Sequence, residues 1–156
     1  MRRFTFIHAW LLIAACVCAP ITVAFAEPLS DAKTLMEEGE KLLEKASKER
    51  RKSRRADKLA EGLKKISEAY ILITTHDLQR DAPELLQKLG DQLARTNGLA
   101  EITELRQSLM AKAIDASVAG KMSEAYEALA RLKELDPRDP VVDYALTVVG
   151  ERTEEE

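Results

Sequence analysis

His76 and Asp77 are adjacent side chains that could together form part of an acid–base site. The sequence has one other histidine, His8, close to the N-terminus, and no serine or cysteine stands in a pattern that marks it as a nucleophile. A lone histidine at the predicted end of a helix is more often a capping or solvated group than a general base. We therefore predict no catalytic residue and a protein that is not an enzyme.

Carboxylates gather at Glu37, Glu38 and Glu40 and recur at Asp136 and Asp139. Calcium loops need a glycine-turned segment, and structural zinc sites need nearby histidine or cysteine ligands. Neither feature accompanies these acids. The sequence therefore predicts no metal site, and no other motif suggests a cofactor.

The N-terminal segment has the layout of a secretory signal peptide. Two arginines precede an apolar run over residues 9–17, which Pro20 ends, and Ala24 and Ala26 supply the small residues that precede a cleavage position. We expect residues 1–26 to be a signal peptide removed after Ala26. The mature protein would then be periplasmic or secreted.

Two alternatives remain for this segment. Residues 4–26 are long enough to span a bilayer, so without cleavage they would anchor the chain in a membrane. Ile13-Ala14-Ala15-Cys16 resembles the lipobox of bacterial lipoproteins, in which Cys16 would carry the lipid. Pro20 and the small residues near position 26 favour cleavage, and the apolar stretch after Cys16 counts against lipidation because such a tether is usually polar.

Removal of residues 1–26 would leave a chain without thiols and with few aromatic rings. Both cysteines lie in that segment, so the remainder could form neither a disulfide nor a cysteine-ligated metal site. Two arginines and no acid are lost, which takes the formal net charge from −3 to −5. Nucleic-acid binding needs a basic footprint or rings for stacking, and only Tyr70, Tyr126 and Tyr144 remain. We expect no nucleic-acid partner.

Apolar residues recur at intervals of three and four from Ser30 onward, which predicts amphipathic helices. One apolar face covers residues 32–46 and a second covers residues 59–73. No proline lies between residues 31 and 74, so these two faces belong either to a hairpin or to one rod of about 65 Å, at about 1.5 Å per residue. Residues 71–75 are β-branched enough for a strand but would have no partner strand.

Local signals delimit the later helices. Asp81, followed by a proline and a glutamate, predicts a capped helix start, and Asn97-Gly98 predicts its end through a left-handed backbone. A fourth predicted helix runs to Gly120, and a fifth runs from about Met122 to Leu135.

Asp139 is predicted to cap a final helix, with Pro140 at its first position and its end near Val149. Connections this short predict antiparallel neighbours. The fold class is therefore all-α, with about six helices stacked as antiparallel hairpins over residues 27–150, and residues 151–156 form an acidic disordered tail.

Residues 109–140 resemble one tetratricopeptide repeat, a two-helix unit of about 34 residues. The residues that carry the resemblance are Gly120 at the turn, Ala125 at the helix contact, Leu129 and Leu132 on the buried face, and Pro137 at the closing turn. The first helix departs from the family pattern, with Leu109, Lys112-Ala113 and Ala116 at its usual anchors. Lys65 to Tyr70 also nearly duplicates Lys121 to Tyr126, which indicates an internal echo. The resemblance implies a helical solenoid fragment that binds proteins.

One charge run stands out between Lys48 and Lys58, where seven basic residues face two acids for a local net charge of +5. We expect a solvated helix end or hairpin tip. The alternative is weak contact with an anionic membrane surface through Arg50, Arg51, Arg54 and Arg55.

Two functional hypotheses follow. The first is an exported, non-enzymatic scaffold whose groove between hairpins holds a protein or peptide partner of unknown identity. The alternative is a structural helical hairpin or coiled-coil protein of the cell envelope, tethered to a membrane if the N-terminal segment is retained; residues 32–46 supply its heptad-like seam. The sequence leaves the oligomeric state open.

Overall fold

The chain forms six α-helices and no strand over residues 20–153, the part that the computed structural model describes. This confirms the predicted all-α class. Residues 1–19 and 154–156 lie outside the described part, and with them lie Cys16, most of the predicted signal peptide and the end of the predicted tail. The helices are α1 (Pro20–Ser47), α2 (Lys52–Thr75), α3 (Pro83–Asn97), α4 (Ala100–Val118), α5 (Met122–Leu135) and α6 (Pro140–Thr153).

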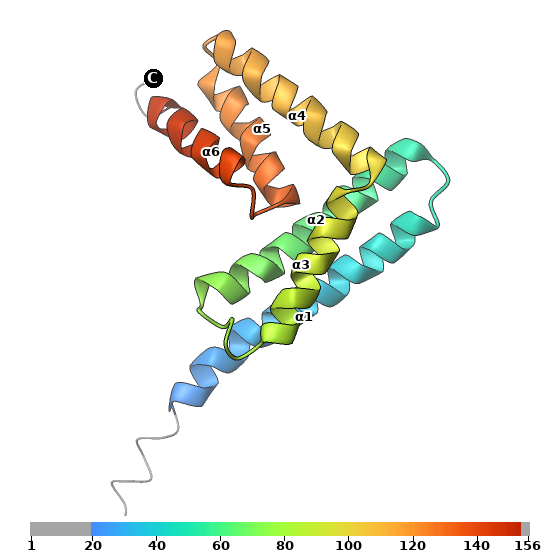
Figure 1. Ribbon diagram of the computed structural model, residues 1–156, viewed down its shortest axis with the longest axis vertical. Helices are drawn as coiled ribbons and strands as arrows, with labels where there is room; N and C mark the ends of the chain where they lie inside the picture. Colours follow the sequence, from blue (N-terminus) through green and yellow to red (C-terminus); the bar gives the residue numbers. More distant parts are fainter. Residues whose placement is uncertain (1–19, 154–156) are drawn as a thin grey trace, which may run out of the picture.

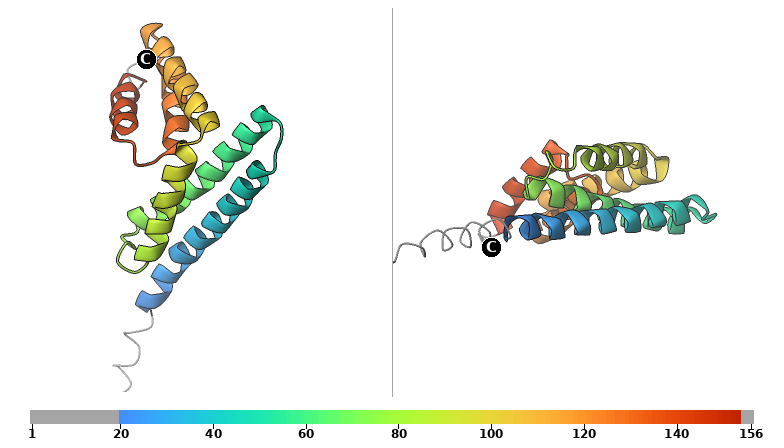
Figure 2. Two further views of the ribbon diagram at one scale, coloured as in Figure 1. Left: turned by 45° about the vertical axis from the view of Figure 1, so that its right-hand side comes forward. Right: turned by 90° about the horizontal axis from the view of Figure 1, so that it is seen from below.

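Helix α2 is the centre of the arrangement (Figure 1). It pairs antiparallel with α1, and α3, α4 and α5 also pack against it. Helices α4, α5 and α6 form a second antiparallel group, seen from other directions in Figure 2. Helices α3 and α4 touch sparsely and diverge from their short connection, so the expectation that all successive helices lie antiparallel is wrong at this one corner.

Residues 31–74 form a hairpin rather than a rod. The chain leaves α1 after Ser47 and re-enters a helix at Lys52, inside the basic run. Glu49 stabilises the turn, because its carboxylate accepts hydrogen bonds from the Arg51 backbone N–H at 3.3 Å and from Lys58 Nζ at 2.8 Å. Folding back lets the apolar faces of α1 and α2 cover each other, which a rod would leave in water.

Two glycines allow α1 and α2 to approach at backbone distance. A Cβ placed on Gly39 would lie 2.7 Å from Ile66 Cδ1 and 3.0 Å from the Gly62 carbonyl oxygen. One on Gly62 would lie 2.8 Å from Leu43 Cδ2 and 3.2 Å from the Gly39 carbonyl oxygen. A side chain at either position would therefore overlap atoms of the opposite helix, so this close contact requires glycine at both positions.

The core runs continuously from the hairpin into the second helix group. Each fully buried leucine or isoleucine contributes about 1.5–3 kcal/mol relative to exposure in water. The large apolar side chains with almost no exposed surface are Leu63, Ile66, Ile73, Leu78, Leu89, Leu93, Ile102 and Val142.

The predicted helix ends fare unevenly. Asp139 does cap α6, since its Oδ1 accepts hydrogen bonds from the backbone N–H groups of Val141 at 3.0 Å and Val142 at 3.4 Å. Asp81 does not cap α3, whose N-cap is Ala82 without a side-chain cap. Gly98 ends α3 with φ −76°, so the predicted left-handed backbone is wrong there.

A residue with a left-handed backbone conformation follows the end of α2 and the end of α4. Gly120 has φ +74°, and the Lys121 N–H reaches back to the Ala116 carbonyl at 2.9 Å, the Schellman arrangement of helix termini. Asp77 has φ +54°, and Leu78 N–H bonds the Ile73 carbonyl in the same way. The turn predicted at Gly120 is thus confirmed, whereas at position 77 an aspartate adopts the left-handed backbone that usually favours glycine.

The first and last helices extend beyond their expected bounds. Helix α6 continues through Gly150 to Thr153 rather than ending near Val149. Helix α1 begins at Pro20, so the predicted cleavage position lies inside a helix that also contains Pro28. No helix in residues 20–153 is both long and apolar enough to cross a membrane.

Candidate functional site

The His76–Asp77 pair lies in a surface turn. His76 is the C-cap of α2, with its backbone N–H 3.2 Å from the Leu72 carbonyl, and both side chains are exposed. The left-handed Asp77 turns the chain towards α3. The backbone of both residues therefore helps to end α2.

The two groups of acidic residues considered above as possible metal ligands lie on different elements of the fold. Glu37 and Glu38 are exposed on α1, and Glu38 pairs with Lys65 at 3.3 Å. Asp136 and Asp139 lie on the connection between α5 and α6 and accept hydrogen bonds from arginines. Among residues 20–153, no three or more His, Cys, Asp or Glu side chains gather closely enough to hold a metal ion.

A groove of about 320 Å³ lies between α2, α4 and α5, where the two helix groups meet. Ligand clefts typically enclose about 300–1,000 Å³, so it is large enough for a few side chains. Its apolar lining is Ala60, Leu105, Leu109 and Leu135, and its charged lining is Asp57, Glu61, Lys64, Arg131 and Glu134. We call this site the interhelix groove.

Charges on the rim of the interhelix groove are only partly paired. Lys64 Nζ lies 2.8 Å from Glu134 Oε1 and bridges α2 to α5, and this hydrogen bond raises the pKa of Lys64. Asp57 and Glu61 lie one turn apart on the exposed side of α2, and no ion pair within residues 20–153 involves them or Arg131. Beside its apolar floor the groove therefore offers two carboxylates and one guanidinium that form no ion pair with the rest of residues 20–153.

The residues of the predicted repeat serve the core. Ala125, Leu129 and Leu132 are buried on α5, and Pro137 is buried in the turn that follows. Leu109 is buried as well, and it also forms part of the groove floor. The repeat-like residues therefore hold α4 against α5, and that contact sets one wall of the groove.

The basic run covers the turn of the α1/α2 hairpin. Four of its members pair with carboxylates: Lys48 with Glu44, Lys52 with Glu104, Arg55 with Glu101 and Lys58 with Glu49. The Arg55–Glu101 contact, at 3.4 Å, is an ion pair without hydrogen-bond geometry.

The other three members form what we call the basic tip: Arg50, Arg51 and Arg54. All three are exposed, and none pairs with a carboxylate within residues 20–153. Arg55, which the sequence places in the same group, differs because Glu101 of α4 already neutralises it.

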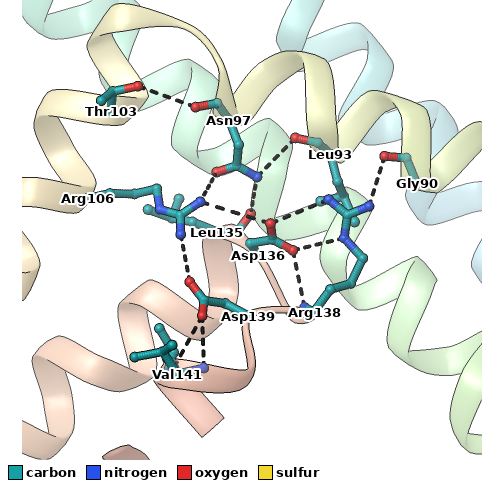
Figure 3. A network of polar contacts seen from close by, with 11 residues as sticks. Gly90, Leu93, Asn97, Thr103, Arg106, Leu135, Asp136, Arg138, Asp139 and Val141 are labelled. Carbon is teal, nitrogen blue, oxygen red and sulfur yellow. Dashed lines mark hydrogen bonds and ion pairs between the residues drawn. The ribbon is translucent and has the colours of Figure 1, made fainter.

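A polar joint fixes the second helix group to α3 (Figure 3). Arg106 Nη2 lies 2.8 Å from Asp139 Oδ2, and Arg106 Nη1 donates to Asn97 Oδ1 at 3.3 Å. Asn97 Nδ2 in turn donates to the carbonyls of Leu93 and Leu135, each at 3.0 Å.

Arg138 completes the joint from the far side of the same turn. Its Nε donates to Asp136 Oδ1 at 3.0 Å, and its Nη1 donates to the Gly90 carbonyl at 3.2 Å. We call Asn97, Arg106, Asp136, Arg138 and Asp139 the polar joint. It links α3 to α4 and to the connection between α5 and α6.

The sequence pattern did not reveal the groove. Leu105 and Leu109 are spaced as core residues, and Asp57, Glu61 and Lys64 as an ordinary solvated stripe. The spacing of those three charges along one side of α2 was the only available signal, and it lacks meaning until α4 and α5 are placed beside it. No protein-family model, curated protein or solved structure matches the chain.

Proposed function

We propose that this protein is a non-enzymatic interaction scaffold, built of tetratricopeptide-like hairpins, whose interhelix groove binds a segment of another protein. The observation that carries the proposal is the groove itself, with its apolar floor of Leu105, Leu109 and Leu135 beneath a charged rim. An apolar floor supplies affinity, and rim charges select partners and orient them.

The rim indicates the chemistry of the partner. Asp57 and Glu61 lie one helical turn apart and pair with no basic side chain within residues 20–153, so they favour a lysine or arginine of the incoming segment. The matching segment therefore carries an apolar side chain for the floor and a basic residue beside it. Arg131, on the other wall, favours an acidic residue farther along.

Burial of the α1 seam favours this proposal over a coiled-coil envelope protein. The heptad-like stripe consists of Ala32, Met36, Gly39, Leu43 and Ala46, of which Leu43 is half-buried and the other four are buried against the rest of the chain. A seam already covered by α2 is not free for a second copy.

The N-terminal pattern supports an exported scaffold. Pro28 is the second residue after the proposed cut, where a helix tolerates proline because the first backbone N–H groups have no partner in the helix. In an uncut helix the same proline removes one hydrogen bond and crowds the preceding turn. Cleavage after Ala26 therefore lets α1 begin at a favourable residue. Mass spectrometry of the secreted protein gives its N-terminus.

Selection from a display library of short random peptides tests the groove. We expect enriched peptides to share an apolar residue next to lysine or arginine, and to lose at least about tenfold in affinity for the double variant Asp57→Lys, Glu61→Lys, since each charge contact contributes about 1 kcal/mol.

Ile114→Lys is the matched control, because Ile114 is an exposed apolar residue on α4, 55 % accessible, that does not line the groove. Peptides should bind this variant as they bind the wild type. Selection that enriches no peptide, or peptides that bind the groove variant unchanged, would refute the proposal.

A further inference from the structure

We propose that the basic tip is a second binding site, which docks the hairpin turn onto the phosphate groups of an anionic lipid surface. The site is Arg50, Arg51 and Arg54, and the inference does not depend on the proposed function of the interhelix groove. It rests on how the structure divides the basic run into paired and free charges.

Four of the seven basic residues in the run are paired with carboxylates. The acids of α1, of the turn and of α4 neutralise Lys48, Lys52, Arg55 and Lys58, with closest atoms 2.6–3.4 Å apart. The tip arginines, interspersed among them, have no carboxylate partner within residues 20–153. The pairing that fastens the turn to α4 therefore leaves three exposed arginines within five residues at the turn.

The basic tip lies at one end of the α1/α2 hairpin. It lies where two antiparallel helices reverse direction, at the far end of the hairpin from the start of α1 (Figures 1 and 2). A projecting turn can meet a flat surface end-on. The 28 residues of α1 extend about 42 Å at about 1.5 Å per residue, so a protein docked by its tip would hold the start of α1 well away from that surface.

The arginine side chains of the tip match the chemistry of phosphate groups. Arginine forms bidentate hydrogen bonds with phosphate oxygens, and each basic residue near an anionic leaflet contributes about 1 kcal/mol of attraction. The run between Lys48 and Lys58 contains no aromatic or large aliphatic side chain. Contact with headgroups would therefore be electrostatic, without insertion among the acyl chains, and weakened by salt.

A lipid surface fits the tip better than nucleic acid does. Nucleic acids bind a broad basic footprint or a row of stacking rings. Three arginines on a convex turn of a chain with net charge −3 provide neither. A dense array of headgroup phosphates can instead engage all three side chains at once.

Vesicle sedimentation tests the inference, using protein expressed with its own N-terminal segment. Vesicles of phosphatidylcholine alone give the baseline, and vesicles with added phosphatidylglycerol give the anionic surface. We expect the wild type to bind the anionic vesicles in excess of the baseline, and salt to remove the excess. Replacing Arg50, Arg51 and Arg54 together with glutamine should weaken the excess binding about a hundredfold.

The matched control removes the same charge elsewhere. Lys33, Arg80 and Lys112 are exposed and lie outside the basic run, on α1, on the α2–α3 turn and on α4. Their triple replacement with glutamine should change binding by no more than about threefold, because charges beyond a Debye length of about 10 Å are screened. Circular dichroism should show both variants folded.

Three outcomes would overturn the inference. The wild type could bind both vesicle types equally, the two triple variants could lose binding to the same degree, or a short DNA duplex could bind more tightly than the anionic vesicles at the same salt. The second outcome would mean that net charge alone controls binding, and the third that the tip serves a different polyanion. None of them affects the peptide selection on the groove.

Discussion

Where α1 packs against α2, the carbonyl oxygens of Gly39 and Gly62 each lie close to the opposite glycine, and the nearest side-chain atoms there are carbons of Ile66 and Leu43. The polar joint on the other side of α2 is built differently. There, side chains from α3, α4 and the α5–α6 turn meet through hydrogen bonds and ion pairs of 2.8–3.9 Å. Both regions join helices, but they are sensitive to different changes. Added side-chain atoms should destabilise the first, and loss of a charged side chain should destabilise the second.

This difference indicates what each region contributes. Close packing fixes the distance between two helices over their whole length, because overlapping atoms repel steeply. Hydrogen bonds fix an angle at one place, because each has a preferred direction. The hairpin therefore provides a rigid support, and the polar joint sets how the second helix group stands on it.

The largest expected effect comes from adding atoms at the crossing. Gly62→Leu should destabilise the protein by about 3 kcal/mol or more, measured by urea unfolding, because its Cβ alone would overlap Leu43 and approach the Gly39 carbonyl. Gly90→Ala is the control. A Cβ there meets only Arg138 Nη1 at 3.7 Å, so helix propensity should raise stability by up to about 1 kcal/mol. Equal effects at both positions would show that the crossing is not closely packed.

A second packing test concerns the α4/α5 contact. Ala125 has no exposed surface, so Ala125→Leu should lower the unfolding free energy by about 1–3 kcal/mol. Ala111→Leu places the same side chain on the exposed side of α4 and should be nearly neutral. An unchanged thermal transition for Ala125→Leu would contradict the predicted close helix contact at Ala125.

Loss of charge should be felt at the polar joint. Arg106→Met keeps most of the aliphatic stem but removes the donor to Asp139 Oδ2 and to Asn97 Oδ1, which should cost about 1–2 kcal/mol. Lys112→Met, on the exposed side of the same helix, should cost less than about 0.5 kcal/mol. If the two variants unfold at the same urea concentration, the joint contributes nothing to stability.

The two left-handed helix ends allow a smaller, opposite pair of changes. Gly120→Ala should destabilise by about 1 kcal/mol, because a Cβ is strained at φ +74°. Asp77→Gly relieves the same strain at φ +54° and should stabilise by about 0.5 kcal/mol, since aspartate tolerates this backbone better than alanine does. Differential scanning calorimetry should show shifts of opposite sign; shifts of the same sign would contradict the assigned backbone.

The smallest effect is the pH dependence of the hairpin turn. The hydrogen bond from Lys58, with that from the Arg51 backbone, lowers the pKa of Glu49. A lowered pKa means that ionised Glu49 stabilises the fold above the ordinary value of about 4.5, and that this contribution disappears as pH falls through the folded value.

The Glu49→Gln variant should therefore unfold at a lower urea concentration than the wild type at neutral pH. The difference in unfolding midpoint should shrink as the pH falls. Glu127→Gln, at an exposed position on α5, should match the wild type throughout. A difference between Glu49→Gln and the wild type that grows in acid would have the wrong sign for this contact.

Particular residues show how far sequence reasoning reached. Met122 and Leu135 bound α5 as predicted, and Asp139 caps α6 as predicted, because these features depend on neighbours within a few positions. The predictions at Asp81 and Gly98 were wrong. Both are residue types that favour helix ends, but α3 starts after Ala82 without a side-chain cap, and Gly98 has a right-handed backbone. The interhelix groove was not assigned at all, because its walls come from three helices far apart in the sequence.

The sequence by itself determined that the chain is helical and which side of each helix is apolar, because helix formation and amphipathic spacing involve residues within one or two turns. Only the tertiary structure decided that residues 31–74 double back, since no proline or glycine marks the turn and the gain comes from burying two distant faces. It also decided which basic residues of the run between Lys48 and Lys58 pair with carboxylates. Charge pairing depends on distance in space, and a sequence records only order along the chain.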